Sequence, residues 1–229
     1  APEERQRVPH HLIDVVAPDE VLTLAQYQEL AYQAIDAVLA RRRIPLLVGG
    51  TGQYVRAVVE GWGIPRVPPN EELRAELYRQ AESEGEEVLH ARLREVDPAA
   101  AQRIDSRNVR RVVRALEVYL ETGRPISELQ RKKKPPYRIL QIGLTMERQA
   151  LYRRIDERVD RMIEEGLVEE VRRLVKRGYG YDLPSMSGLG YQQIGLCLQG
   201  QVSLEVAIQL IKRHTRRFVR HQYNWFRLD

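Results

Sequence analysis

Two short apolar runs are the only clear candidates for buried β-strands in this sequence of 229 residues. The first is "IPLLV", residues 44–48, which a glycine ends, and the second is "RILQIGLTM", residues 138–146. Short apolar runs that lie between helices and glycines are typical of strands in a parallel sheet covered on both faces. Two strands are too few for a self-sufficient sheet. We therefore expect either strands that the pattern does not reveal or a domain of which this chain carries only part.

The segment between the two runs is helical and highly charged, and it contains no strand candidate. Proline-rich breaks bound it, "GWGIPRVPPN" (residues 61–70) on one side and "KKKPPY" (residues 132–137) on the other. Inside it, Asn70 and Asn108 stand at positions that favour helix N-caps, and Gly123 stands where a helix is expected to end. The segment is therefore predicted to be an all-helical insertion.

The order of a strand, a helical excursion and a second strand predicts an α/β core interrupted by an all-α lobe. We place the core at residues 1–64 and 137–229 and the lobe at residues 65–136. Apolar periodicity in the core predicts four helices, and a fifth is expected to begin near Gln53. The four periodic helices cover residues 22–42, 147–166, 167–178 and 203 to about 226. The tract "YGYDLPSMSGLGYQQIG", residues 179–195, is predicted to be a loop because Gly, Ser and Tyr dominate it.

Composition narrows the class of protein. No apolar stretch is long enough to cross a membrane, and the polar N-terminal residues lack the apolar region of a signal peptide, so we expect a cytoplasmic protein. The single cysteine, Cys197, excludes an intrachain disulfide and a cysteine-based zinc site. The five histidines are not spaced as a metal-ligand set, so no metal ligands are predicted in this chain.

Basic residues are grouped, although the net charge is only +5. The groups are residues 41–43, 107–114, 131–134, 172–173 and 212–221. Any one of them is compatible with a solvated helix face that pairs with nearby glutamates. Together they indicate a polyanionic partner such as a nucleic acid, because cations that neutralise phosphates release condensed counterions.

The stretch "GGTGQY", residues 49–54, has the glycine content of a phosphate-binding loop. It lacks the lysine of a Walker A motif and does not fit the G-x-G-x-x-G pattern, so as a nucleotide signature it is weak. Gly49, Gly50 and Gly52 would let the backbone approach a ligand. Thr51 offers a hydroxyl at the carboxyl end of a predicted strand, where open α/β sheets bind ligands. From these residues alone, a helix cap and a site residue stay equal alternatives for Thr51.

Five motifs in order resemble the bacterial tRNA dimethylallyltransferase family, whose members are also called tRNA isopentenyltransferases. They are "PHHLIDVVAPDE", "RIPLLVGGTGQYVRAVVEG", "NVRRVVRALEVYLETGRPISEL", "DLPSMSGLGYQQI" and "KRHTRRFVRHQYNWFR". The resemblance spans essentially the whole chain. It implies transfer of a dimethylallyl group from dimethylallyl diphosphate to N6 of the adenosine adjacent to the anticodon, position 37, in tRNA. It also implies a P-loop-NTPase-like core, a requirement for Mg²⁺, and a monomer.

One part of the family pattern has no counterpart in this sequence. Family members carry a Walker A-like loop and a D-S-x-Q motif ahead of the matched region, and neither occurs here. These motifs supply the pyrophosphate cradle, the hydroxyl that binds Mg²⁺ and the expected general base. The resemblance therefore implies that this polypeptide is inactive alone.

The resemblance also assigns roles to individual residues. Thr51 matches a catalytic position at the tRNA adenine, and Arg158 matches an arginine directed at the diphosphate, with Arg154 one turn earlier on the same helix face. Contacts with tRNA are implied for Thr51, Arg74, Arg110, Arg111, Arg114, Ser187, Gly188, Gly190, Tyr191 and Gln192. The simpler alternative for Arg154 and Arg158 is pairing with Asp156, Glu157 or Asp160. The simpler alternative for Tyr191 is a core aromatic.

Two other functions remain open. One is an RNA-binding helical module on an inert α/β scaffold, and the other is a relative of the P-loop nucleoside or nucleotide kinases. If the resemblance holds, the lobe grips the anticodon stem-loop, the core holds the prenyl donor, and the two proline-rich breaks are candidate hinges.

Overall fold

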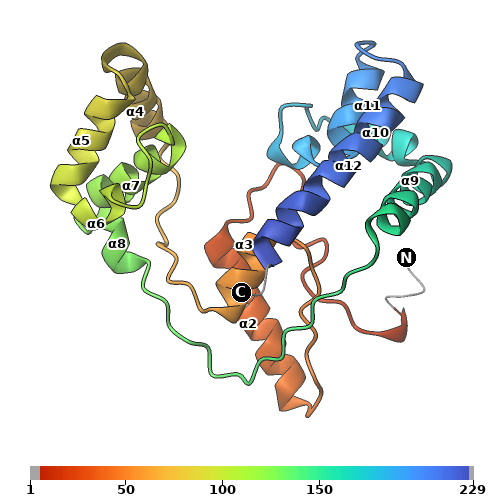
Figure 1. Ribbon diagram of the computed structural model, residues 1–229, viewed down its shortest axis with the longest axis horizontal. Helices are drawn as coiled ribbons and strands as arrows, with labels where there is room; N and C mark the ends of the chain where they lie inside the picture. The colour runs from red at the N-terminus through yellow and green to blue at the C-terminus, as the bar shows by residue number, and fades with distance from the viewer. Residues whose placement is uncertain (1–5, 227–229) are drawn as a thin grey trace. The chain divides into compact units, whose positions relative to one another are not determined.

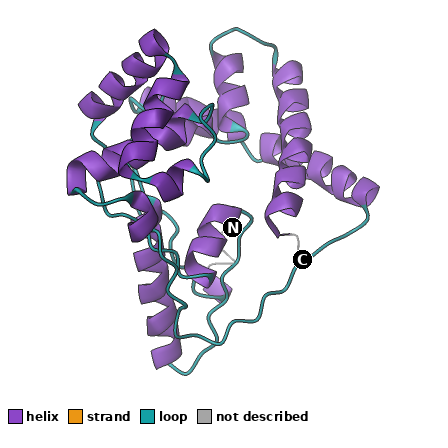
Figure 2. Ribbon diagram, turned by 60° about the vertical axis from the view of Figure 1, so that its left-hand side comes forward, coloured by secondary structure: helices purple, strands orange, loops and turns teal. Residues whose placement is uncertain are grey.

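The computed structural model describes residues 6–226, and all regular secondary structure in that range is helical (Figures 1 and 2). The chain divides into two compact units. The first unit comprises residues 1–23, 34–55 and 138–229, and the second comprises residues 24–33 and 56–137. Two helices contribute residues to both units, α2 (Leu24–Ala40) and α3 (Gly52–Val59). No helix within residues 6–226 is long and apolar enough to cross a membrane.

The second unit contains a bundle in which α4, α5 and α7 pack against one another, with two one-turn helices beside them (Figure 1). Its helices are α4 (Glu71–Glu84), α5 (Glu86–Val96), α6 (Pro98–Ala101), α7 (Val109–Thr122) and α8 (Ile126–Leu129). Leu77, Leu89, Leu93, Val112 and Leu116 form the centre of its core and are almost completely buried. Apolar residues at helical spacing on α5 and α7 therefore hold this unit together.

The predicted caps of the second unit are confirmed. The Asn70 side chain accepts a hydrogen bond from the Leu73 amide at 3.0 Å, and that of Asn108 accepts one from the Arg111 amide at 3.4 Å. Gly123 ends α7 in the left-handed conformation, with φ of 69°. Each of these signals acts within a few residues, so the sequence alone was sufficient to predict it.

The two proline-rich breaks lie side by side and are joined by backbone hydrogen bonds. The Lys133 amide donates to the Gly61 carbonyl at 2.7 Å, and the Gly63 amide donates to the carbonyl of Arg131, which directly precedes the second break, at 3.1 Å. Gly61 has φ of 61°, and a Cβ there would lie 1.8 Å from the Lys133 carbonyl oxygen, so only glycine fits. Any bending in one break must therefore move the other or break this pairing.

The first unit has a core formed by α9, α10, α11 and α12. Its helices are α9 (Arg148–Glu164), α10 (Leu167–Lys176), the 3₁₀ helix η1 (Pro184–Ser187), α11 (Tyr191–Leu198) and α12 (Leu204–Phe226). Both α9 and α11 pack on α12, and α10 packs on α9 and α11. Val159, Val171, Ile194 and Ile211 are almost completely buried among them.

The predicted loop over residues 179–195 is wrong in its second half. Residues 184–187 form η1, and α11 begins at Tyr191. The loop prediction followed the glycine and serine content of the tract. Ile194, which has no exposed surface, shows instead that burial of an apolar face on the core determines a helix here.

Neither predicted strand forms within the described residues. Residues 44–48 and 138–146 have no regular secondary structure. Ile44, Leu46 and Val48 in the first run, and Leu140, Ile142 and Leu144 in the second, are between 75% and 95% exposed. A strand is defined by hydrogen bonds to a neighbouring strand, and neither run has such a neighbour in the described part of the chain. The α/β prediction is therefore supported in its helices but not in its sheet.

Asp97 is a buried carboxylate that links α6 to α8. Its Oδ1 accepts from the Ala100 amide and its Oδ2 from the Ser127 amide, each at 2.9 Å, and its exposed fraction is 1%. Burial on its own raises the pKa of Asp97, but hydrogen bonds from Ser127 and Ala100 outweigh it and hold the pKa below its ordinary value.

We predict that Asp97→Asn destabilises the protein by about 1–3 kcal/mol at neutral pH and flattens its loss of stability in acid. The stability that Asp97 contributes is fully present above the pKa of the unfolded carboxyl and is lost as the pH falls through the lower folded pKa. Thermal unfolding followed by circular dichroism from about pH 7 to about pH 3 measures both effects. The exposed control Asp19→Asn should produce neither, and an unchanged acid limb in Asp97→Asn would contradict the assignment.

Candidate functional site

The glycine-rich turn that precedes α3 meets the last turns of α12. Gln222 Nε2 donates to the Gly50 carbonyl at 3.2 Å. A Cβ on Gly50 would lie 1.8 Å from that Nε2, and a Cβ on Gly52 would lie 2.4 Å from the indole ring of Trp225. Side chains of α12 thus occupy the space beside Gly50 and Gly52, and a residue larger than glycine would overlap them at either position. Access of a ligand to the backbone at Gly49, Gly50 and Gly52 stays a prediction.

Thr51 combines a capping backbone with an available hydroxyl. Its carbonyl accepts hydrogen bonds from the Tyr54 and Val55 amides at 3.0 and 3.1 Å, which begin α3. Its side chain is exposed, and its hydroxyl has no partner among residues 6–226. The two alternatives that the sequence left open are thus compatible, because the backbone supports the helix while the hydroxyl remains available.

An open groove of about 690 Å³ between α9 and α12 is strongly basic. Five arginines line it, Arg148 from α9 and Arg213, Arg216, Arg217 and Arg220 from α12, together with Tyr152 and Glu205. The five guanidinium groups face one lining carboxylate. Such a concentration of guanidinium groups favours a ligand that carries phosphates.

Tyr152 lies between arginines in this groove. Arg148 Nε donates to the Tyr152 hydroxyl at 3.1 Å, and the guanidinium carbons of Arg148 and Arg216 lie 5.4 and 5.9 Å from the centroid of its ring. The hydrogen bond from Arg148 is the main reason that the pKa of Tyr152 lies below its ordinary value. The sequence did not single out Tyr152 or Arg148, although Arg148, Tyr152 and Asp156 follow one another at a spacing of four on one helix face.

The predicted diphosphate ligands Arg154 and Arg158 lie on the exposed side of α9 and do not line the groove. Two of the three carboxylates proposed as their simpler partners pair with α12 instead. Asp160 pairs with Lys212 at 2.6 Å, and Asp156 pairs with Arg216 at 3.5 Å. Within the described range, Arg154 and Arg158 form no ion pair. Their simpler alternative therefore finds no support.

Residues of the tract 187–192 differ in how far they reach the surface. Ser187, Gly188 and Gln192 are exposed, whereas Gly190 is buried, with φ of 99°, and its amide donates to Gln193 Oε1 at 2.9 Å. Tyr191 is half-buried against the core of the first unit, and its hydroxyl donates to Glu170. Burial and the neighbouring Glu170 raise the pKa of Tyr191 to about 12. These contacts favour a core role for Tyr191.

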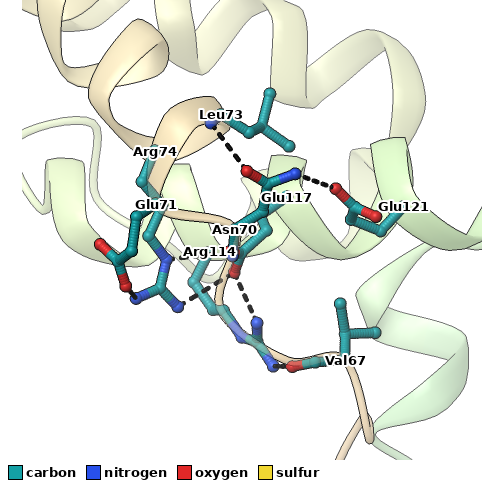
Figure 3. A network of polar contacts seen from close by, with 8 residues as sticks. All are labelled: Val67, Asn70, Glu71, Leu73, Arg74, Arg114, Glu117 and Glu121. Carbon is teal, nitrogen blue, oxygen red and sulfur yellow. Dashed lines mark hydrogen bonds and ion pairs between the residues drawn. The ribbon is translucent and has the colours of Figure 1, made fainter.

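Arg74 and Arg114 converge on one buried carboxylate, that of Glu117 (Figure 3). Arg74 donates from Nε at 2.8 Å and from Nη2 at 3.1 Å, and Arg114 donates from Nη1 at 2.5 Å. The backbone amide of Asn70 adds a hydrogen bond at 2.8 Å. Burial on its own raises the pKa of Glu117, but these hydrogen bonds, that of Arg74 first, outweigh it and hold the pKa below its ordinary value.

The other predicted RNA-binding arginines, Arg110 and Arg111, are exposed near the beginning of α7. Arg110 lies one turn before Arg114 on the same helix face. Arg107, just ahead of the helix, pairs with Asp105 at 2.7 Å. Four of the predicted arginines thus belong to the second unit, two of them fixed by Glu117 and two exposed on α7.

Known proteins similar to this chain share one activity. The family model for IPP transferase matches residues 1–229. A tRNA dimethylallyltransferase of Thermomicrobium roseum is 55% identical over 225 residues, which are 98% of this chain and 68% of the relative. One of a Roseiflexus species is 54% identical over 226 residues, 99% of this chain and 74% of the relative.

Two solved structures that are similar to this chain also belong, by their names, to enzymes that prenylate tRNA. The tRNA isopentenylpyrophosphate transferase of Bacillus halodurans matches with a TM-score of 0.67 and 42% identity, over 100% of this chain and 72% of that one. A eukaryotic dimethylallyltransferase acting on tRNA matches with a TM-score of 0.78 and 26% identity, over 97% of this chain and 57% of that one.

We predict that Gly52→Ala displaces Trp225 and the end of α12. Alanine is acceptable to a helix backbone, so the cause would be the overlap of its Cβ with the indole ring, at a cost of about 1–3 kcal/mol. Tryptophan fluorescence in a Trp62→Phe background reports on Trp225 alone, because the chain has two tryptophans. Gly49→Ala is the matched control, since its Cβ would lie 3.9 Å from Val55. Equal spectra for the two variants would refute the predicted displacement.

Proposed function

Because the chain belongs to the IPP transferase family, we infer that it is a tRNA dimethylallyltransferase. It transfers a dimethylallyl group from dimethylallyl diphosphate to N6 of the adenosine adjacent to the anticodon, position 37. The observation that carries this conclusion is the match along all 229 residues, with relatives of that activity at 54–55% identity. An inert RNA-binding module and a nucleotide kinase have no comparable support.

The reaction makes three demands on the protein. The bond from the allylic carbon to the diphosphate oxygen breaks as a bond from that carbon to N6 forms, and the amine then passes a proton to a base, which the family is expected to carry in its D-S-x-Q motif. The leaving diphosphate requires cations, the amine must be held beside the allylic carbon, and the adenine must leave its stack to be reached. In this proposal, the hydroxyl of Thr51 orients the amine, and Arg154 and Arg158 neutralise the diphosphate. What supports these roles is the exposed, unpartnered hydroxyl of Thr51 and the two arginines without ion pairs in the described range.

For magnesium, the described residues offer no fit. Within residues 6–226, no three His, Cys, Asp or Glu side chains come together in a group that could hold a metal ion. We therefore assign no step to Mg²⁺, whose role stays an expectation from the family. The expected inactivity of this polypeptide alone also stays a prediction.

For the fold, the finer proposal is a P-loop-NTPase-like parallel sheet in which residues 44–48 and 138–146 are strands. Alternate residues of both runs expose large apolar side chains, and such faces are buried in a sheet that is covered on both sides. The proposed core is residues 1–64 and 137–229, and the proposed lobe is residues 65–136. Apolar surface of this kind also marks where another element packs.

The proposed tRNA interface includes the arginines of the second unit. Arg110 and Arg111 are exposed, and Arg74 and Arg114 keep about a third of their side-chain surface exposed, at 28% and 31%. In the first unit, Ser187, Gly188 and Gln192 are accessible to RNA. The half-buried Tyr191 and the buried Gly190 shape that tract from within.

We predict that the complete product of the gene, given dimethylallyl diphosphate, a divalent cation and tRNA, forms a prenylated adenosine that mass spectrometry detects. The 229-residue chain, assayed in parallel, tests the expected inactivity. Thr51→Ala should lower kcat far more than it raises the Kd for tRNA, whereas Thr51→Ser, which keeps the hydroxyl, should retain most activity. ATP hydrolysis without a prenylated product would overturn the proposed function.

We predict that Arg111→Ala weakens tRNA binding roughly three- to tenfold and lowers the slope of log K against log salt by about 1. The physical reason is the loss of one phosphate contact and of the counterions released by it. Binding titrations at several salt concentrations measure both quantities. Arg79→Ala, which removes an exposed arginine of α4 in the same unit, is the matched control. Identical salt slopes for the two variants would remove Arg111 from the interface.

A further inference from the structure

We propose that Glu117 is a positioning residue for tRNA binding, because it fixes the guanidinium groups of Arg74 and Arg114 in the orientation that meets RNA phosphates. This inference rests on the proposed function, since it takes tRNA as the ligand of those arginines. Glu117 was not among the residues that the sequence singled out.

Glu117 cannot contact RNA itself. Its side chain has no exposed surface, and both carboxylate oxygens are saturated. Oε1 accepts from Arg74 Nε and the Asn70 amide, and Oε2 accepts from Arg74 Nη2 and Arg114 Nη1 (Figure 3). Any effect of Glu117 on a ligand must therefore act through the groups it holds, which are the two arginines and the Asn70 amide.

The arginines remain partly available. Glu117 balances one of the two guanidinium charges. The second counter-charge is the carboxylate of Glu71, which pairs with Arg74 Nη1 at 3.5 Å but is 81% exposed, so water screens this pair and a phosphate can replace it. A guanidinium has five N–H donors, and Arg74 directs two and Arg114 one of them at the carboxylate. A long, flexible side chain loses rotamer freedom when it binds a phosphate. Glu117 imposes that ordering before the ligand arrives, which is how preorganisation strengthens binding.

The same carboxylate fixes the end of the first proline-rich break. Asn70 donates its amide to Glu117, caps α4 at the Leu73 amide and donates its side-chain nitrogen to Glu121 at 2.7 Å. Arg114 Nη2 donates to the Val67 carbonyl at 3.0 Å. The position of this break, the start of α4 and the orientation of both arginines are therefore set together.

Charge and position predict opposite results for Glu117→Gln. Removing a negative charge from beside two cations would, by Coulomb attraction alone, tighten tRNA binding and steepen its salt dependence. Loss of positioning would weaken binding, because an amide presents donors where both arginines also donate. The sign of the change therefore separates the two accounts.

The experiment measures the Kd for tRNA of the chain and four variants, Glu117→Gln, Glu117→Asp, Arg74→Ala and the double variant Glu117→Gln/Arg74→Ala. KM and kcat are measured on the complete gene product. We expect Glu117→Gln to raise Kd and the KM for tRNA about tenfold with little change in kcat. The double variant should bind more weakly than Arg74→Ala, because Glu117 still holds Arg114 when Arg74 is absent, but by less than the two single losses combined, because the Arg74 share is already lost. Glu117→Asp keeps the charge but shortens the reach, so it should also weaken binding, and it keeps the test valid if Glu117→Gln fails to fold.

Leu116→Ala is the matched control, since Leu116 is the buried neighbour of Glu117 on α7 and its apolar side chain cannot hydrogen-bond to the arginines. All binding is measured below the melting temperature of each variant. Equal weakening by Leu116→Ala would show that Glu117 acts only through stability, and unchanged or tighter binding by Glu117→Gln would also overturn the proposal. If Arg74→Ala leaves binding unchanged, the proposed tRNA contact at Arg74 fails and the inference falls with it. If Arg74→Ala weakens binding and neither Glu117 variant does, only the positioning role fails.

Discussion

Placing an ionised carboxylate inside a helical unit costs several kcal/mol unless hydrogen bonds replace the water it loses, and the second unit is arranged around that requirement. Glu117 satisfies it with two arginines from different helices and one backbone amide. Removing one of these partners would leave a buried charge uncompensated, which costs more than the pair itself contributes. The beginning of α4, the middle of α7 and the end of the break that leads into α4 are consequently bound to one another by one side chain.

A comparable dependence exists in the first unit, where the environment of Thr51 is determined far along the chain. Gln222 donates to the carbonyl of Gly50, and Trp225 fills the space beside Gly52, so the residues on both sides of Thr51 are in contact with the last turns of α12. The same helix lines the basic groove with four arginines. The orientation of α12 therefore sets both the turn that carries Thr51 and the positive surface of this unit.

The parts of the fold that the sequence predicted correctly depend on local physics. Asn70, Asn108 and Gly123 act on backbone groups within four residues, and their caps are confirmed. The strands at residues 44–48 and 138–146 could not be predicted in the same way. A strand requires hydrogen bonds from a partner strand, and the composition of a short run does not show whether a partner is present. The helix α11 was missed for a related reason, since Ile194 favours a helix only through burial against α12.

For the candidate site, the sequence identified arginines but not their state. An arginine held at a buried carboxylate and an arginine extended into solvent look identical in the sequence, but they contribute differently to binding. Arg74 and Arg114 are ordered in advance and partly neutralised by Glu117, so they favour specific geometry at a phosphate. Arg154 and Arg158 form no ion pair in the described range, and in their proposed role they would lose conformational freedom on binding the diphosphate. If these arginines bind a polyanion as proposed, position in the contact network, rather than the number of cations, decides which of them fix its register and which attract it without fixing it.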